Sequence, residues 1–252
     1  MRPLRPVQVL LFLFTCTLQP GCRHAHPADD GAPASSPSPE QAAATVQPGD
    51  LLFQDLDCGP LCDAIEAVTE GYGGRDFSHV GMVVRMADTL AVIEAIGADV
   101  HLTSLTDFQQ RSSKVLARHV KPAHRALADR AAAHALAFIG MPYDDAFLPD
   151  NGKLYCSELI AMAYEHANSG DPVFTSAPMT FKDPRTGAFF PAWVAYYAEL
   201  DLPIPEGKAG CNPGGLSRNV ELFGDRRPPS SRSSQMMTRK KVPVKVFRST
   251  WS

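Results

Sequence analysis

The amino-acid sequence predicts an α+β domain. Short apolar segments rich in β-branched residues gather in the first part of its globular region, and two longer helical segments follow them as a block. The strands and helices do not alternate, so a parallel sheet with crossover helices is not expected. Of the 252 residues, 44% are hydrophobic and 20% are charged. This composition is sufficient for one core of about 180 residues with tails.

Residues 1–22 carry the features of an export signal. Arg2 and Arg5 precede an apolar run over residues 7–18, and Cys22 follows that run directly after a glycine. This order resembles a bacterial lipoprotein signal, in which Cys22 would be the lipidated residue; ordinary secretion with cleavage further along is the alternative. We therefore expect an exported protein that is lipid-anchored in the bacterial envelope, on the outer-membrane or periplasmic side, or else periplasmic or secreted.

The segments that flank the globular region are biased in composition. Residues 23–47 are rich in Pro, Ala and Ser and predict a flexible tether. Residues 225–252 contain eight Lys and Arg residues and one Asp, a net charge of about +7, whereas the rest of the chain is about −10. We expect this basic tail to be disordered, with binding to anionic lipid or another acidic partner as the alternative. The globular domain is expected over residues 48–224.

Local patterns predict the elements of this domain in order. "PGD" indicates a turn, "LLFQ" after it a buried strand, and residues 59–70 a helix that "GYGG" ends. "FSHVGMVVRM" and "LAVIEAIG" predict two strands joined by the tight connection "ADT". "ADVHLTSLTDF" predicts a strand followed by a turn or short helix, and "VLARHV" another strand. Residues 123–139 and 155–166 predict helices, and the proline-rich residues 171–202 predict loops.

Three residues of this domain suggest nucleophilic catalysis. Cys156 stands where an apolar helix begins, a position at which a thiolate is stabilised. His79 lies on a predicted strand and could act as the base, and Glu94 on the next strand could accept the other ring N–H. A carboxylate inside "AVIEAIG" is costly to bury unless it is paired, so Glu94 itself calls for a partner.

The register of the predicted hairpin decides whether two of these residues can meet. A two-residue turn at Ala87 and Asp88 places His79 opposite Ile96, with Glu94 as its diagonal neighbour on the same face. A three-residue turn without a bulge would place His79 and Glu94 on opposite faces.

Each residue also has a purely structural interpretation. Cys156 alone is more often a small buried hydrophobic residue, and a lone histidine in an apolar strand is usually part of the core. A zinc site formed by His79, Glu94, His101 and Cys156 is a further alternative, although no two of these have a usual ligand spacing. The preferred interpretation has no metal.

Four cysteines remain outside the export signal, and their pairing is open. Cys58 and Cys62 are too close for a relaxed bridge if both lie on one helix. A bridge from one of them to Cys211 would close a longer loop and stabilise the domain more. Metal binding by "CGPLC" is a weaker possibility, because no histidine follows nearby.

Five short motifs together resemble a known family. "GDLLFQ", "FSHVGMVV", "VIEAIG", "GMPYDDAF" and "LYCSELI" occur in the order of the permuted papain-like amidases, often called YiiX/YebB-like. These are the circularly permuted branch of the NlpC-type cysteine peptidases, in which the histidine precedes the cysteine. "GCNPGGLS" is similar to the family's C-terminal segment. The resemblance covers residues 46–223.

This resemblance implies a papain-like α+β fold, with the nucleophile helix packed on a small antiparallel, barrel-like sheet. It implies Cys156 as nucleophile, His79 as general base and Glu94 as the orienting residue. Tyr143 and Tyr155 match family aromatic positions, and with Ser78 they are candidates for lining the pocket or stabilising an oxyanion.

The expected activity is hydrolysis of an amide or ester bond by a monomeric enzyme without a cofactor. Its substrate would be a peptidoglycan peptide, a lipopeptide or an N-acyl compound of the envelope, and nucleic acid is not expected as a partner. An acyltransferase of the lecithin:retinol acyltransferase-like type is the enzymatic alternative. The non-enzymatic alternative is a lipoprotein of the envelope that binds a ligand without catalysis.

Overall fold

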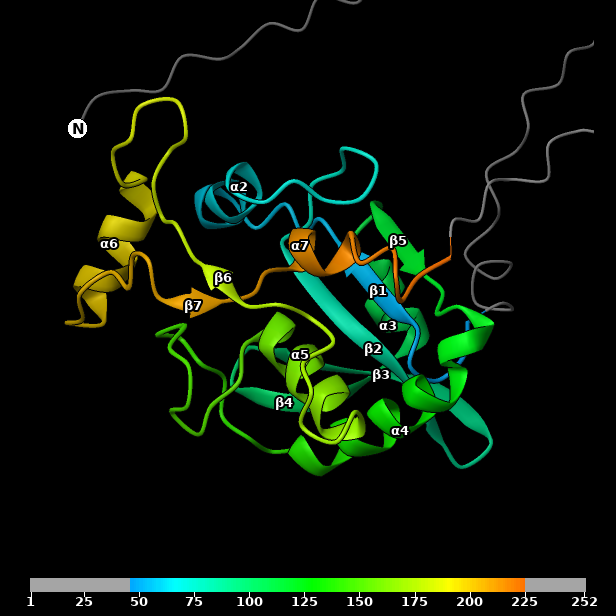
Figure 1. The fold of residues 1–252 in the computed structure, drawn as a ribbon. Coiled ribbons are helices and arrows are strands. Elements are labelled where there is room, and N and C mark those ends of the chain that lie inside the picture. Colours follow the sequence, from blue (N-terminus) through cyan, green and yellow to red (C-terminus); the bar gives the residue numbers. More distant parts are fainter. Residues whose placement is uncertain (1–45, 225–252) are drawn as a thin grey trace, which may run out of the picture. The chain divides into compact units, whose positions relative to one another are not determined.

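The structure is a computed structural model that describes residues 46–224. The predicted signal, the tether up to residue 45 and the basic tail lie outside these residues, and so does Cys22. The described chain forms an α+β unit with its strands mainly in the first half (Figure 1). Its strands are β1 (Leu51–Gln54), β2 (His79–Met86), β3 (Thr89–Ile96), β4 (Asp99–Ser104), β5 (Val115–Arg118), β6 (Ala177–Pro178) and β7 (Ala209–Gly210). Its helices are α2 (Pro60–Ala67), α3 (Leu105–Gln110), α4 (Arg125–Ala135), α5 (Cys156–Ala167), α6 (Pro191–Glu199) and α7 (Pro213–Ser217).

The first five strands form one antiparallel sheet in the order β4-β3-β2-β1-β5. The α+β class is therefore as predicted. The sheet is open, because β4 and β5 are its two edges and do not pair with each other, so the expected barrel-like closure is absent. The last two strands form a separate short pair.

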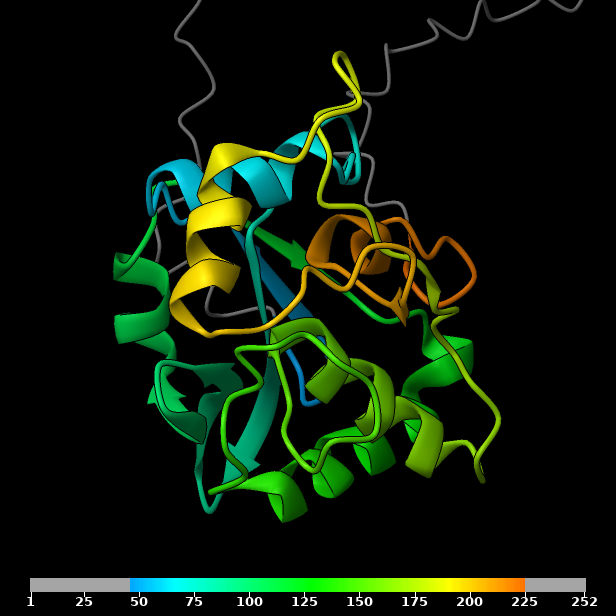
Figure 2. The same cartoon turned by 90° about the vertical axis from the view of Figure 1, so that its left-hand side faces the viewer.

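The two faces of the sheet are covered by different elements. Helices α4 and α5 pack on one face, where Val80, Met82 and Ile93 belong to the main core. Figure 2 shows these two helices side by side in the lower part of the view. On the other face α3 places Phe108 over Val83 and Val92. Because both faces are buried, β2 is a continuous apolar run rather than an alternating one.

The motif "GD" before β1 has a structural reason. Gly49 has a φ of 84°, and a Cβ added there would lie 2.6 Å from the Cβ of Ala128 on α4. Asp50 is 1% exposed, and its carboxylate binds Arg125 at 3.0 Å, His119 at 2.9 Å and the backbone N–H of Val120 at 3.0 Å. The pair thus joins the start of β1 to α4 and to the segment after β5.

Helices α2 and α6 are far apart in the sequence but lie side by side (Figure 2). They share a small core in which Ala64, Phe181, Trp193 and Tyr197 are buried. Helix α6 was not predicted, because the prolines around it indicated loops. Its proline stands at the first helical position, where a missing N–H costs nothing.

The disulfide of this domain joins Cys58 to Cys62, with Cα atoms 5.3 Å apart. The pairing that the sequence left open is therefore Cys58 with Cys62 and not a bridge from either of them to Cys211, and neither cysteine of "CGPLC" keeps a free thiol for a metal. A bridge between these two cysteines is unfavourable only if both lie on one helix, and α2 begins at Pro60, after Gly59 with a φ of 85°. Cys58 therefore lies outside the helix and can turn back towards it.

Within residues 46–224 no helix combines the length and the apolar character that crossing a bilayer demands.

Candidate active site

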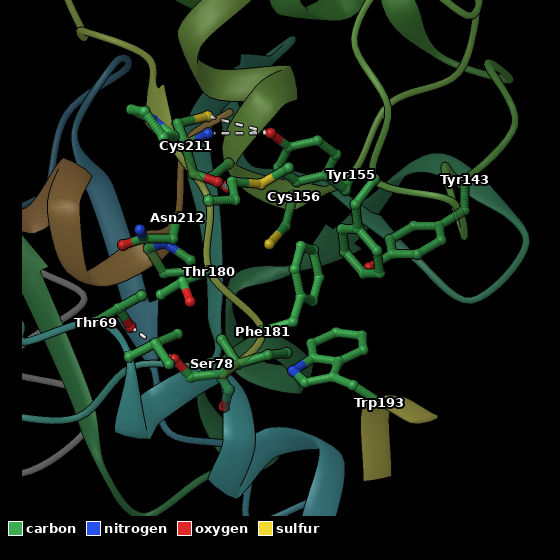
Figure 3. A pocket seen from close by; sticks show the side chains of 17 residues that line it. Thr69, Ser78, Tyr143, Tyr155, Cys156, Thr180, Phe181, Trp193, Cys211 and Asn212 are labelled. Carbon is green, nitrogen blue, oxygen red and sulfur yellow. Dashed lines mark hydrogen bonds between the residues drawn. The ribbon is translucent and has the colours of Figure 1, made fainter. Parts of the chain in front are cut away.

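Cys156 is the first residue of α5, and its sulfur points into a pocket (Figure 3). Tyr155 is the N-cap and gives no side-chain cap, but the Glu158 carboxylate two residues after Cys156 accepts the Tyr155 backbone N–H. This is one half of a capping box. The backbone N–H of Cys156 itself stays free of an intrahelical partner, as the first turn of any helix requires.

His79 and Glu94 meet through the hairpin of β2 and β3. The turn has two residues, and Met82 pairs with Ile93 and Val83 with Val92, which is the predicted register. His79 and Glu94 therefore share a face as diagonal neighbours. His79 Nε2 lies 2.6 Å from Glu94 Oε2, and the two side chains are 4% and 0% exposed.

Two further side chains hold Glu94, and the sequence did not predict either of them. Arg111, the C-cap residue that follows α3, donates from Nη1 to Oε2 at 2.9 Å and from Nη2 to Oε1 at 2.5 Å. Thr103 on β4 donates its hydroxyl to Oε1. Burial raises the Glu94 pKa, but the hydrogen bonds from His79, Arg111 and Thr103 outweigh it, and the pKa falls to about 2. The signal available in the sequence was the buried glutamate, which demands a cation.

Hydrogen bonding makes His79 a strong base. Burial lowers its pKa, but its hydrogen bonds with Cys156 and Glu94 outweigh that effect, and the pKa rises to about 9. Because Nε2 is taken by Glu94, Nδ1 is the nitrogen that remains for the Cys156 sulfur. The three side chains thus form a buried row in which His79 lies between Cys156 and Glu94.

The three residues predicted to line the pocket or stabilise an oxyanion differ in the hydrogen bonds that their hydroxyl groups already make. The Tyr155 hydroxyl accepts the backbone N–H of Cys211 at 3.1 Å, so it fixes the segment after β7. The Ser78 hydroxyl accepts the backbone N–H of Leu56 at 2.9 Å and also bonds Glu66. The Tyr143 hydroxyl has no hydrogen bond to another described residue, and the ring reaches the pocket from the loop before α5 (Figure 3).

The two cysteines outside the disulfide, Cys156 and Cys211, line the same pocket but differ in environment. Cys211 is free, buried and part of the same pocket as Cys156. Burial raises the Cys211 pKa to about 12. Ser157 donates its hydroxyl to the Cys211 carbonyl at 3.0 Å, which ties α5 to this segment.

The zinc alternative is not supported. Among the described residues, no three His, Cys, Asp or Glu side chains are grouped so that they could hold a metal ion. His101 lies opposite Glu94 on β4, but its Nδ1 pairs with Asp99 at 3.0 Å and its side chain is 44% exposed.

The arrangement of these groups suits nucleophilic chemistry. A cysteine at a helix N-terminus, a histidine that can exchange its proton, and a buried carboxylate that fixes the histidine are the parts of an acyl-transfer site. The His79 side chain is buried, whereas Cys156 lines the pocket.

Comparison with known proteins gives this site a context. YiiX of Escherichia coli K12, an uncharacterized protein, is 30% identical over 124 residues, which cover 48% of this chain and 58% of YiiX. The crystal structure of the protein described as metalloprotein YiiX from E. coli O157:H7 has a TM-score of 0.58 at 24% identity, covering 70% of this chain and 94% of that one.

Residues 45–238 match the family described as permuted papain-like amidase enzymes, YaeF/YiiX, C92. This stretch contains every described residue and more than half of the chain. The protein therefore belongs to the permuted papain-like amidases, a family of cysteine-hydrolase type.

Proposed function

We propose that this protein hydrolyses an amide bond, or a related ester, through a covalent acyl-enzyme on Cys156. The observation that carries the proposal is the buried row of Cys156, His79 and Glu94, in which Nε2 of His79 lies 2.6 Å from Glu94 Oε2. Only the sulfur of this row lies in the pocket. A carbonyl that enters the pocket therefore meets the nucleophile first.

Each step uses groups that are in place. The Cys156 thiolate attacks the carbonyl carbon, and the protonated His79 then gives its proton to the leaving amine or alcohol, which leaves a thioester. Water attacks the thioester while His79 takes its proton, and the acid is released together with the Cys156 thiolate, so that the thiolate and the protonated His79 are restored. Glu94 stays ionised throughout and stabilises the imidazolium. The backbone N–H of Cys156 and the Tyr143 hydroxyl are the donors proposed for the oxyanion.

The first test compares two thiols of one pocket. Iodoacetamide at pH 6, followed by peptide mapping, should modify Cys156 rapidly and leave Cys211 unmodified, because the pKa of Cys211 is raised to about 12 by burial. His79→Ala should slow labelling of Cys156. Equal labelling of the two thiols would contradict the assignment of Cys156 as nucleophile.

The second test follows the covalent intermediate. Incubation with an activated acyl ester should add one acyl group to Cys156, detected as a mass increase that hydroxylamine removes. The Cys156→Ala variant should neither gain this mass nor turn over substrate. Turnover that persists undiminished in this variant would refute the mechanism.

We also propose that the protein is exported and anchored through lipidated Cys22, on the strength of the sequence alone. Growth with a labelled fatty acid should label the wild-type chain and not Cys22→Ala. Label that is retained in this variant would refute the anchor.

A further inference from the structure

A buried arginine at the end of β5 has no counter-ion among residues 46–224. Arg118 is 4% exposed, and its Nε and Nη2 are buried without a hydrogen-bond partner in that part of the chain. Its guanidinium lies 3.6 Å from the centroid of the Tyr72 ring and 5.1 Å from that of Phe223. A ring attracts the cation through its face, but the N–H donors lie in the guanidinium plane and still need an acceptor. Because a buried charge with unmet donors is costly, Arg118 calls for an anion.

The outer edge of β5 is open beside this arginine. Strand β5 is the last of its sheet and pairs on its inner edge with β1. The His119 carbonyl faces the outer edge, where it accepts the backbone N–H of Gly224 at 3.2 Å. Backbone groups alternate between the two edges along a strand, so Ala117 faces the outer edge as well. Among the described residues, none hydrogen-bonds to the Ala117 backbone across this edge.

The last described residues already run antiparallel along that edge. Val120 and Phe223 form an antiparallel bridge, and the end of the described chain lies beside the end of β5 (Figure 1). Each step forward along one antiparallel strand is a step back along its partner. Gly224 is opposite His119, so the next two residues, 225 and 226, would stand opposite Arg118 and residue 117.

The residue that this register places opposite Arg118 is an aspartate. Asp225 is the only acidic residue in the basic segment 225–252, and two arginines and two prolines follow it. Residues directly opposite each other share a face, with Cβ atoms about 5 Å apart, which suits an arginine and a carboxylate. The family match also continues past Gly224, to residue 238. The start of the basic segment therefore belongs with the domain.

We propose that residues 225–227 dock on the outer edge of β5 as an additional strand of the sheet, with the Asp225 carboxylate bound to the Arg118 guanidinium. The partner of this edge is thus a segment of the same chain. The pairing supplies the anion that Arg118 lacks and covers the open backbone groups of Ala117.

The proposed register specifies which backbone groups take part. Residue 226, like Gly224, turns its N–H and C=O towards β5 and exchanges hydrogen bonds with Ala117. The N–H of Arg227 faces solvent. Pro228 stands at the next inward-facing position and has no N–H, so the pairing ends before it. The rest of the basic segment therefore leaves the domain beside the start of β5.

Two proline variants of the full-length protein test the docking. Arg226→Pro removes an N–H that the added strand needs, and Arg227→Pro removes one that faces solvent, while each loses one positive charge. Amide hydrogen exchange followed by NMR should find the Ala117 N–H protected in the wild type and in Arg227→Pro. In Arg226→Pro it should exchange at least about tenfold faster. Equal exchange in the two variants, or an unprotected Ala117 amide in the wild type, would overturn the proposal.

A second pair of variants tests the ion pair. Asp225→Asn and Glu221→Gln each remove one carboxylate, but the Glu221 side chain is exposed. Asp225→Asn should lower the melting temperature by about 5 °C, because it leaves Arg118 buried without its anion, and Glu221→Gln should leave it unchanged. Equal melting temperatures of these two variants would refute the pairing.

A double-mutant cycle assigns the effect to the two partners. In an Arg118→Met background, Asp225→Asn should cause no further fall in melting temperature, since its partner is already gone. A fall as large as in the wild-type background would contradict the pairing. Where Arg118→Met does not fold, the comparison of Asp225→Asn with Glu221→Gln decides alone.

A second copy of the chain is the other occupant that an open sheet edge could receive. The exchange of the Ala117 amide would therefore be measured at several protein concentrations. Under the proposal its protection does not depend on concentration. Protection that rises with concentration and persists in Arg226→Pro would assign the edge to a second copy and overturn the proposal.

Discussion

Arg111 holds both carboxylate oxygens of Glu94, with Nη1 2.9 Å from Oε2 and Nη2 2.5 Å from Oε1. The same carboxylate is hydrogen-bonded to His79, so one buried group links Arg111, at the C-cap of α3, to the proposed base. Arg111 touches neither the pocket nor Cys156, and its guanidinium lies 5.2 Å from the Phe108 ring centroid. Its role is therefore to keep Glu94 ionised and fixed.

Replacing Arg111 should change the pH dependence of activity. In Arg111→Ala the Glu94 pKa should rise from about 2 towards its ordinary value, because two hydrogen bonds to the anion are lost. The acid limb of kcat/KM should then move to higher pH, and the protein should lose on the order of 2 kcal/mol of stability. Arg111→Lys keeps the charge but not the fork and should be intermediate. The exposed Arg85→Ala is the control, and an unshifted acid limb would contradict the role of Arg111.

The raised pKa of His79 should make the free energy of unfolding of the protein depend on pH. A histidine whose folded pKa is about 9 contributes stability that is present below its unfolded value, near 6.5, and lost as pH rises through 9. The difference in unfolding free energy between the wild type and His79→Gln should therefore shrink by on the order of 3 kcal/mol from pH 6 to pH 10.

Denaturant titrations at several pH values would measure this difference. Burial raises the pKa of Glu66 to about 7 and that of Glu158 to about 8, so ionisation of these two groups also lowers the free energy of unfolding as pH rises. This contribution is the same in the wild type and in His79→Gln, and it cancels in the difference. A constant difference between the wild type and His79→Gln would refute the raised pKa.

Gly81 should not tolerate a side chain. It lies between His79 and Val83 on β2, and a Cβ there would come within 2.4 Å of Val92 Cγ1 and 2.9 Å of the Phe108 ring. Gly81→Ala should cost about 1–3 kcal/mol by overpacking and should reduce activity, because Phe108 packs beside the His79 ring. Gly224→Ala, whose added Cβ would meet its nearest atom at 3.8 Å, is the matched control. Equal melting temperatures of the two variants would contradict this expectation.

The disulfide should stabilise α2 by a modest amount. The loop closed between Cys58 and Cys62 is short, so the double variant Cys58→Ser/Cys62→Ser should lose about 2 kcal/mol. Reducing agent should lower the melting temperature of the wild type and have no effect on the double variant. Non-reduced peptide mapping should find residues 58 and 62 linked and Cys211 free. A linkage to Cys211 would contradict the structure.

Much of this fold and half of the site follow from local sequence signals. The hairpin that joins His79 to Glu94 was predictable because a two-residue turn between two apolar runs fixes the register. The contacts of Arg111 and Thr103 with Glu94 were not predictable, because they depend on how α3 packs against β3 and no local sequence pattern indicates that packing. The sequence left the disulfide pairing open, because one residue, Gly59, decides whether Cys58 belongs to the helix.

The permuted order of the site also has a consequence for folding. His79 and Glu94 are 15 residues apart and meet within one hairpin, whereas Cys156 reaches them only when α5 docks on the sheet. Local contacts form early and distant ones late, since closing a longer loop costs more entropy. The proposed base and its carboxylate can therefore assemble while the Cys156 thiol is still remote. The proposed hydrolysis would then begin only at the final docking step, and a partly folded chain would not cleave the molecules around it.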